Sequence, residues 1–471
     1  MLFAAAFRAE LLKALRRPCE QQTMTEFSGV LRRAKLPSML RASGAAAAGR
    51  IAILAAGLGS SLLLPLALPP DKVGLYFIAQ ILTSGFAILA MMGLTFTAPA
   101  LVSAAAAQGD FGRARDVIMR IQAIVGVCGL TIACAFWLAD RWVPLGENAA
   151  AWRGVLAIVA LQIPCAGLGA VQVELLRAVH AIRSSAFLMA FPSTVVAIFV
   201  AFALTTRFQP NLDQVLLCSL AGYAISAGVG AFCISSSCRH WSQPANEPIG
   251  AVAIVQRTLP NLATTLVLFG LSQVDMILLT LFSSLQEIAQ YGIALRISTV
   301  LIMPLSIANS AFAPSAVHLW TLDDRTGLQK ALRLLVSVAT LLTFLMYAGL
   351  ATLGYTLVHL WNPHYENSLW IALILGAGQL GHVLGGASGI LLMVLGDEKS
   401  AFRLTLLTGV ATVALCFLGI LVGGPFWLAS AAAICNVLQV YLFAKRVKDR
   451  FQLDATIRAL WPTEPVRHST T

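Results

Sequence analysis

The sequence predicts an all-α integral membrane protein with about twelve transmembrane helices in two six-helix bundles. Hydrophobic residues make up 58% of the chain and charged residues only 11%, and the mean hydropathy of +0.81 excludes an ordinary water-soluble globule. Apolar segments of membrane-spanning length recur along the chain, and Lys and Arg are concentrated in alternate connections between them. These three observations predict the fold class.

A helix needs about 20 apolar residues to cross a bilayer, and about twelve segments meet this requirement. The predicted spans are 46–68, 74–97, 117–139, 151–173, 186–205, 212–234, 258–282, 289–313, 332–358, 369–394, 401–422 and 426–444.

The distribution of Lys and Arg orients the chain. Of the 32 Lys and Arg residues, two lie more than three residues inside a predicted span, four lie in or beside connections on one side, and all the others lie in or beside connections on the opposite side or in the two termini. The four are Lys72, Arg141, Arg153 and Arg207. By the positive-inside rule both termini are cytoplasmic, which requires an even number of spans.

An internal repeat divides the chain into two halves. Pro99 ends a span that begins near Gly74, and Pro314 ends one that begins near Gly292, so the two pairs of positions are separated by nearly the same length of chain. Two halves of the same orientation, related by an axis along the membrane normal, follow from this repeat.

The predicted organisation has five parts. They are a basic cytoplasmic or interfacial arm (1–43), a first six-helix bundle (44–235), a cytoplasmic loop between the bundles (236–257), a second six-helix bundle (258–446) and a basic cytoplasmic tail (447–471). No cleavable signal is evident in the arm, and Met1, Met24 and Met39 all remain candidates for the start.

Two full charges lie inside neighbouring predicted spans, Asp275 in the seventh and Arg296 in the eighth. With a turn near 283–288, each charge is roughly 10–12 Å deep at 1.5 Å per residue, so the two can meet across antiparallel helices. A charge at the centre of a spanning helix costs roughly 2.5–3.5 kcal/mol and normally faces a partner or a wet cavity. The pair therefore either lines a transport pathway or fixes the register of the two helices.

Several other function classes are disfavoured. The net charge of +11 does not indicate nucleic-acid binding, because the basic residues form short runs between apolar segments and not one soluble face. The nine cysteines include no CxxC pair and the seven histidines no HExxH spacing, so neither a disulfide framework nor a metal site is predicted.

The stretches LPPDKVGLYFIAQ and MMGLTFTAPALVSAAAAQGDFGRA, and in the second half VDMILLTLFSSLQEIAQYGIALRI and PLSIANSAFAPSAVHLW, carry a family resemblance. They resemble polysaccharide flippases of the multidrug/oligosaccharidyl-lipid/polysaccharide exporter superfamily, with Asp275, Tyr291 and Pro314 at recurring positions. The stretches LVHLWNPHYENSLW and ILLMVLGDEKSAF resemble two later junctions of that family, so the similarity covers roughly residues 45 to 445.

The resemblance implies a carrier of the bacterial inner membrane and not an enzyme. Such a carrier moves undecaprenyl-diphosphate-linked oligosaccharide from the cytoplasmic to the periplasmic leaflet by alternating access, for O-antigen or exopolysaccharide synthesis. Its partners are the lipid bilayer, the lipid-linked oligosaccharide and, where they act together, a polysaccharide polymerase and glycosyltransferases. No cofactor is implied, and the coupling ion or proton, the sugar repeat and the oligomeric state stay open.

A diphosphate crossing hydrocarbon needs a polar, partly cationic cavity, and guanidinium groups bind diphosphate bidentately. The cations that lie more than three residues inside a predicted span are Arg296 and Arg50, although Arg50 is close enough to the cytoplasmic end to snorkel. Further cavity candidates, besides Asp275, are polar residues within spans: Gln273, Asn261, Asn309, Gln379 and His382. Each of these can instead make an interhelical hydrogen bond, and His382 either titrates or is a satisfied core histidine.

Two alternatives remain. A cation-coupled drug or small-molecule antiporter of the same superfamily usually carries an acidic residue in its first span, and IAILAAGLGSSLLLPLAL has none. A membrane-embedded polysaccharide polymerase or ligase needs catalytic groups in an extended external loop. Here the external loops are short, and His359, His364 and Glu366, the one cluster with acid–base groups, are explained by a solvated loop.

Overall fold

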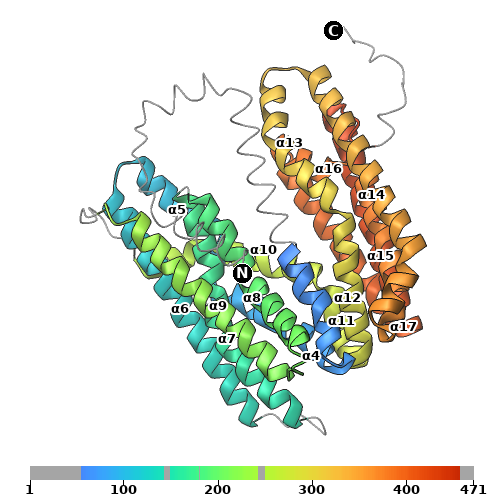
Figure 1. The fold of residues 1–471 in the computed structure, drawn as a ribbon. Coiled ribbons are helices and arrows are strands. Elements are labelled where there is room, and N and C mark those ends of the chain that lie inside the picture. The colour runs from blue at the N-terminus through green and yellow to red at the C-terminus, as the bar shows by residue number, and fades with distance from the viewer. Residues whose placement is uncertain (1–54, 143–148, 180, 242–249, 457–471) are drawn as a thin grey trace. The chain divides into compact units, whose positions relative to one another are not determined.

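The computed structural model describes residues 55–142, 149–179, 181–241 and 250–456, and within these ranges the chain is helical and contains no strand (Figure 1). The predicted basic arm, Arg50 and the end of the predicted tail lie outside the described residues. The chain divides into two compact units, Met1–Gly270 and Leu271–Thr471, and each has its own apolar core.

Among the described residues, nine helices are long and apolar enough to cross a membrane. A tenth is added if α12 and α13, bent by 47° at their junction, count as one span. The nine are α4 (Pro70–Ala90), α6 (Phe111–Trp142), α7 (Ala149–Ala178), α8 (Ile182–Thr205), α9 (Leu212–Ser237), α10 (Ala251–Ser272), α14 (Arg325–Trp361), α15 (Glu366–Leu384) and α17 (Glu398–Phe451). The predicted fold class is confirmed.

The outer surface of these helices suits a bilayer. Leu281 is 70% exposed, Val422 75% and Leu360 78%, and many other large apolar side chains are similarly uncovered. A water-soluble protein does not expose apolar surface on this scale. The chain is therefore a multi-pass membrane protein.

In the first unit, the predicted second span is broken. Helix α4 ends before Met91, and α5 (Leu94–Ala107) begins after Gly93, which has a left-handed φ of 75°. A Cβ on Gly93 would lie 2.9 Å from the Cα of Leu262, so α10 crosses this break at a distance that only glycine allows. The apolar core of the unit includes Val102, Ile118, Leu175, Ile234 and Ile254.

The predicted seventh span, 258–282, is also interrupted. Helix α10 ends at Ser272, and α11 (Val274–Phe282) begins after Gln273, whose φ and ψ of −118° and 9° are not helical. Gly270 and Ser272 precede the interruption, and Gly and Ser pairs are frequent at helix kinks. The boundary between the two compact units falls here, whereas the predicted organisation assigns the whole span to the second bundle.

The second unit starts with a tight hairpin of α11 and α12 (Leu285–Leu301). Ser284 caps α12 through the backbone N–H of Glu287, and the Glu287 carboxylate accepts the Ser284 N–H at 2.9 Å. This capping box lies within the predicted turn region. Helix α13 (Met303–Thr321) follows, then α14, the short 3₁₀ helix η2 (Pro363–Tyr365) and α15.

Two further interruptions involve glycine. The predicted tenth span is divided into α15 and α16 (Ser388–Val394), with Gly386 between them at a φ of 61°. Helix α17 is broken at Gly423 and Gly424, the latter at a φ of 70°, and Pro425 lacks the N–H that would continue the helix. This break separates the predicted eleventh and twelfth spans.

The helix starts follow the sequence repeat. Helix α6 begins at Phe111 and α14 at Arg325, while α8 begins at Ile182 and α17 at Glu398. The two pairs of helix starts are separated by nearly the same length of chain. This spacing matches that of the sequence motifs.

In each unit, the loops that are rich in Lys and Arg lie at the same end. In the second unit, Ala316 near the end of α13, Leu328 near the start of α14, Ala401 near the start of α17 and Phe451 at its end share one core cluster. The loops that carry Arg325, Lys399 and their basic neighbours therefore lie at this end, which we call the basic end. In the first unit, Ala105, Ala114, Leu188 and Cys238 define the equivalent end.

Candidate functional site

Asp275 is the second residue of α11, directly after the interruption at Gln273. It is 8% exposed, and its carboxylate accepts the backbone N–H of Met276 at 2.8 Å and the hydroxyl of Tyr291 at 3.2 Å. Tyr291, on α12, is completely buried. Helix α11 packs on both α12 and α17, and the buried thiol of Cys416 in α17 lies close to Asp275 and Tyr291.

Arg296 lies five residues after Tyr291 on α12 and is exposed. Within the described chain no ion pair joins it to Asp275, so the predicted meeting of the two charges is wrong. Equal depth along the hairpin does not place two residues on facing sides of their helices. Five residues rotate a helix by about 140° beyond a full turn, so Arg296 points in a different direction from Tyr291. Tyr291 therefore faces α11, and Arg296 faces elsewhere.

His382 and Gln379 lie one turn apart on α15, at its contact with α17. The Nδ1 of His382 lies 2.9 Å from the Oδ1 of Asn436 on α17. A Cβ on Gly378 would lie 2.8 Å from the Cα of Ala433, so the two helices approach closely beside this polar pair. The Oε1 of Gln379 is buried and, within the described part of the chain, has no hydrogen-bond partner.

The remaining candidates are dispersed. Asn261 of α10 donates from Nδ2 to the Oγ1 of Thr97 in α5 at 2.8 Å, which is the interhelical hydrogen bond considered as its alternative role. Gln273 is the half-buried residue between α10 and α11. Asn309, on α13, has a buried Oδ1 without a hydrogen-bond partner among the described residues. Arg50 lies outside the described ranges.

The first unit contains a buried polar network around Gln162, a residue that the sequence analysis did not single out. Thr83 of α4 donates to the Oε1 of Gln162 in α7 at 2.8 Å, and the Nε2 of Gln162 donates to the carbonyl of Leu216 in α9 at 2.9 Å. The side chains of Thr83 and Gln162 are fully buried. The signal that could have found Gln162 is an amide in the middle of an apolar span.

One turn away, Gln80 extends this network. The hydroxyl of Tyr223 donates to the Oε1 of Gln80 at 3.2 Å, and the Nε2 of Gln80 donates to the Oγ of Ser219 at 3.2 Å. All of these side chains are neutral. The network therefore satisfies polar groups inside the first unit and brings no full charge into its interior.

The sites differ in what they can bind. Asp275 is covered by protein and already accepts two hydrogen bonds, whereas Arg296 is exposed and its guanidinium can reach an anionic group. No group of three or more His, Cys, Asp or Glu side chains among the described residues is placed to hold a metal ion.

The fold and these sites describe a polytopic α-helical membrane protein built from two compact helical units with buried polar contacts. No family model matches the chain, and no curated protein matches it.

Solved structures show the same fold. An inward-facing multidrug resistance MATE family transporter of the MOP superfamily matches with a TM-score of 0.66 and 16% identity, over 86% of this chain and 94% of that one. An outward-facing structure of such a transporter matches with a TM-score of 0.58 and 14% identity, over 88% and 95%. A MOP superfamily transporter from Pyrococcus furiosus, described as having a binding pocket of reverse polarity that suggests a different function, gives a TM-score of 0.58 and 13% identity over 90% and 96%. The chain has the MATE-type fold.

Proposed function

We propose that this protein is a transporter that moves undecaprenyl-diphosphate-linked oligosaccharide from the cytoplasmic to the periplasmic leaflet by alternating access. The MATE-type fold supports transport, and the sequence resemblance to polysaccharide flippases supports this substrate class. The product serves cell-surface polysaccharide synthesis, and a polymerase and glycosyltransferases act beside the carrier. In this proposal the carrier lies in the bacterial inner membrane with both termini cytoplasmic. The concentration of Lys and Arg at one end of each unit supports this orientation, because basic residues favour the cytoplasmic side.

One observation carries the preference for an anionic substrate. Of the two ionisable side chains deep in the seventh and eighth spans, the carboxyl group of Asp275 is buried under Tyr291, and the guanidinium of Arg296 is exposed. A cationic drug needs an accessible carboxylate, whereas a diphosphate needs an accessible guanidinium. The exposed guanidinium of Arg296 therefore favours a diphosphate substrate over a cationic drug.

The chemistry of the substrate explains the need for a carrier. Moving an ionised diphosphate and its sugars into hydrocarbon without compensating contacts is prohibitive, because each polar group would lose its water. Arg296 and amides such as Gln273, Asn309 and Gln379 lie apart in this structure, and in the proposed cycle they offer replacement contacts when the cavity opens, while the lipid tail stays in the bilayer. The buried oxygens of Asn309 and Gln379 have no hydrogen-bond partner in the part of the chain that the structure describes, so they can accept substrate hydroxyls once transport exposes them.

A cation-coupled antiporter of drugs or small molecules is the second candidate. The observation that favours it is the fold of the multidrug transporters. His382, half-buried and beside Asn436, is the side chain that would titrate in a proton-coupled cycle.

A polymerase or ligase is less favoured. The external cluster places the Nδ1 of His359 2.7 Å from the Oε1 of Glu366, and both side chains are partly exposed. This pair links the end of α14 to the start of α15 at the surface, where no extended loop gathers further groups around it.

The deciding experiment uses purified protein in proteoliposomes. A fluorescent undecaprenyl-diphosphate oligosaccharide is supplied in both leaflets, and a membrane-impermeant glycosidase in the outer medium reports the fraction that becomes accessible. We expect the wild type to raise this fraction above one half over time, Arg296→Ala to abolish the increase, and Arg296→Lys to retain part of it. Arg333→Ala, which changes an exposed arginine at the basic end, is the control and keeps full activity.

The same vesicles loaded with a cationic dye test the antiporter. Proton-driven or sodium-driven dye movement without exposure of the oligosaccharide would replace the flippase proposal by the antiporter. Full flipping by a folded Arg296→Ala carrier would remove Arg296 from the site.

A further inference from the structure

The chain does not leave the second unit where α17 ends. After Phe451, Gln452 adopts a left-handed conformation with a φ of 55°, and the next residues fold back over the basic end. Leu453 is 2% exposed and Ala455 1%, and both belong to the apolar core of this unit. We call residues 452–456 the C-terminal strap.

One side chain of α14 holds the strap by two hydrogen bonds. The Nε2 of Gln329 donates to the carbonyl of Asp454 at 2.7 Å, and the backbone N–H of Asp454 donates to the Oε1 of Gln329 at 2.9 Å. An amide side chain thus pairs with both backbone groups of one residue. The carboxylate of Asp454 accepts the N–H and the hydroxyl of Thr456 at 3.0 and 2.7 Å, which closes the turn.

The strap also covers the interruption of the tenth span. The carbonyl of Ala455 lies against Gly386, between α15 and α16, where a Cβ would collide with it and φ is 61°. The core cluster under the strap contains Phe312 of α13, Val336 of α14 and Leu391 of α16. The strap therefore shares one apolar core with α13, α14 and α16, which are helices from different parts of the second unit's sequence.

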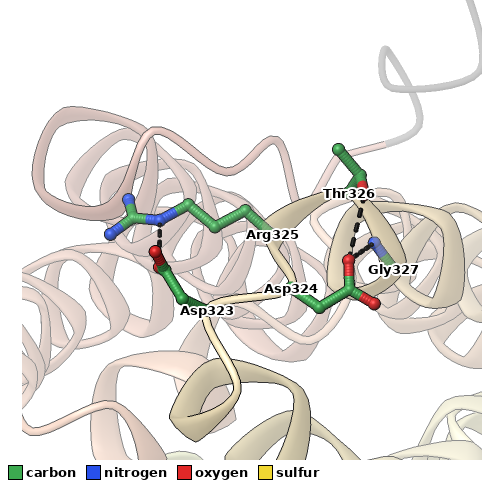
Figure 2. A network of polar contacts seen from close by, with 5 residues as sticks. All are labelled: Asp323, Asp324, Arg325, Thr326 and Gly327. Carbon is green, nitrogen blue, oxygen red and sulfur yellow. Dashed lines mark hydrogen bonds and ion pairs between the residues drawn. The ribbon is translucent and has the colours of Figure 1, made fainter.

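The loop before α14 packs against the same end of the second unit, next to the end of α17. Asp323 forms an ion pair with Arg325 at 3.1 Å, and Asp324 accepts the N–H of Gly327 at 2.8 Å, which caps α14. Figure 2 shows both contacts. The Arg325 guanidinium lies 4.7 Å from the ring centre of Trp320. Trp320 in turn contacts Phe451 edge to face, with the ring centres 5.4 Å apart.

The first unit repeats this arrangement. Helix α9 ends at Ser237, and beyond it the carbonyl of Trp241 accepts the Nη1 of Arg115 in α6 at 3.3 Å. The ring of Trp241 lies 5.4 Å from that of Phe111. Arg115 is the fifth residue of α6 and Gln329 the fifth residue of α14, so equivalent positions of the two units hold the chain that follows α9 and α17.

We propose that the C-terminal strap is a permanent clasp that fuses α13, α16 and the basic ends of α14 and α17 into one rigid body. The interruptions at Ile302 and at Gly385–Gly386 would otherwise allow α13 and α16 to move separately, because each break removes helical hydrogen bonds. With the strap docked, the basic half of the unit moves only as a whole. Its role during transport rests on the proposed function, whereas its effect on rigidity does not.

Hydrogen exchange on the full-length protein in nanodiscs tests the rigidity. Gln329→Leu removes both bonds to Asp454, so we expect exchange to rise at least ~10-fold in the strap and in α16, with the α11–α12 hairpin unchanged. Lys330→Leu, which places the same side chain at the exposed next position of α14, should leave exchange as in the wild type. If Gln329→Leu does not accumulate, a chain ending at Phe451 takes its place, and the expected rise in exchange is then measured in α16 alone.

Two exchange results would overturn the proposal. One is unchanged protection of the strap and α16 in Gln329→Leu, and the other is an equal rise across every helix of the unit, which indicates global loss of stability.

A cross-link separates a permanent clasp from a gate that opens. The double variant Gln329→Cys/Asp454→Cys, oxidised in an otherwise cysteine-free carrier, should flip the oligosaccharide at the level of the reduced protein. Loss of flipping that a reductant restores would show that the strap must open and would refute the permanent clasp. Absence of flipping in the wild type would refute the proposed substrate and leave the exchange result to decide the inference.

Discussion

The hydroxyl of Tyr291 donates to the carboxylate of Asp275 at 3.2 Å, between two helices of one hairpin and out of contact with solvent. The bond joins the first turn of α11 to the middle of α12. An acidic side chain inside a membrane protein is tolerated where other groups satisfy it, and here a phenol and a backbone N–H do so.

A double-mutant cycle measures this bond. Tyr291→Phe leaves the buried carboxylate with one donor fewer, and Asp275→Asn replaces the charged acceptor by a neutral one. We expect each single change to lower the free energy of unfolding and the cycle to give a coupling of about 0.5–2 kcal/mol, the range of interhelical bonds in membranes. Denaturant or steric-trap unfolding in micelles provides the values. Strictly additive effects would contradict a direct bond.

The contact between α15 and α17 depends on the absence of a side chain at Gly378. A Cβ there would lie 2.8 Å from the Cα of Ala433, so Gly378→Ala must separate the helices and disturb the nearby pair of His382 and Asn436. We expect a loss of about 1–3 kcal/mol, seen as a lower melting temperature in detergent.

Gly349→Ala is the matched control. Gly349 lies inside α14 with no atom within 4 Å of the added Cβ, so alanine should be neutral or stabilise by about 0.5–1 kcal/mol through helix propensity. Equal losses for the two substitutions would show that close packing at Gly378 is not the cause.

The sequence predicted the fold class because hydropathy and charge placement are set by the bilayer and not by tertiary detail. It did not predict the interruptions at Gln273 and at Gly385–Gly386, because both segments are long and apolar enough on average to count as single spans, and hydropathy carries no information about backbone direction. Depth along a hairpin placed Asp275 and Arg296 at one level, but the rotation around α12 brings Tyr291 to the carboxylate instead.

Polar partners far apart in the sequence were also beyond prediction. Gln162 meets Thr83 only because α4 and α7 pack together, and nothing in either span identifies the other as its partner. Gln329 and Asp454 are a similar case. Their bond requires the left-handed turn at Gln452, a conformation that non-glycine residues adopt infrequently.

The basic end of the second unit should respond to acid through Asp397. The hydrogen bond from the Nε of Arg446, at 2.7 Å, and a bond from Ser400 lower the pKa of this carboxyl below its ordinary value. A lowered pKa stabilises the fold above the unfolded pKa of about 3.9, and this contribution is lost as the pH falls through the folded pKa.

We therefore expect Asp397→Asn to have a lower melting temperature than the wild type at pH 7. This difference in melting temperature should disappear as the pH falls below about 4. Asp323→Asn is the control, because Asp323 is 83% exposed and such surface ion pairs contribute little at any pH. A gap for Asp397→Asn that stays constant from neutral to acidic pH would exclude the ion pair as its origin.

The two ends of the second unit should lie on opposite sides of the membrane. Asp323 precedes α14 at the basic end, and the exposed His364 follows α14 in η2, so the 37 residues of α14 separate them. Because Lys and Arg favour the cytoplasmic side, His364→Cys should react with a membrane-impermeant maleimide in intact cells, and Asp323→Cys only after permeabilisation. Both variants are compared with the parent protein, whose own cysteines set the background. Labelling of Asp323→Cys in intact cells, with protection of His364→Cys, would reverse the orientation and with it the proposed direction of transport.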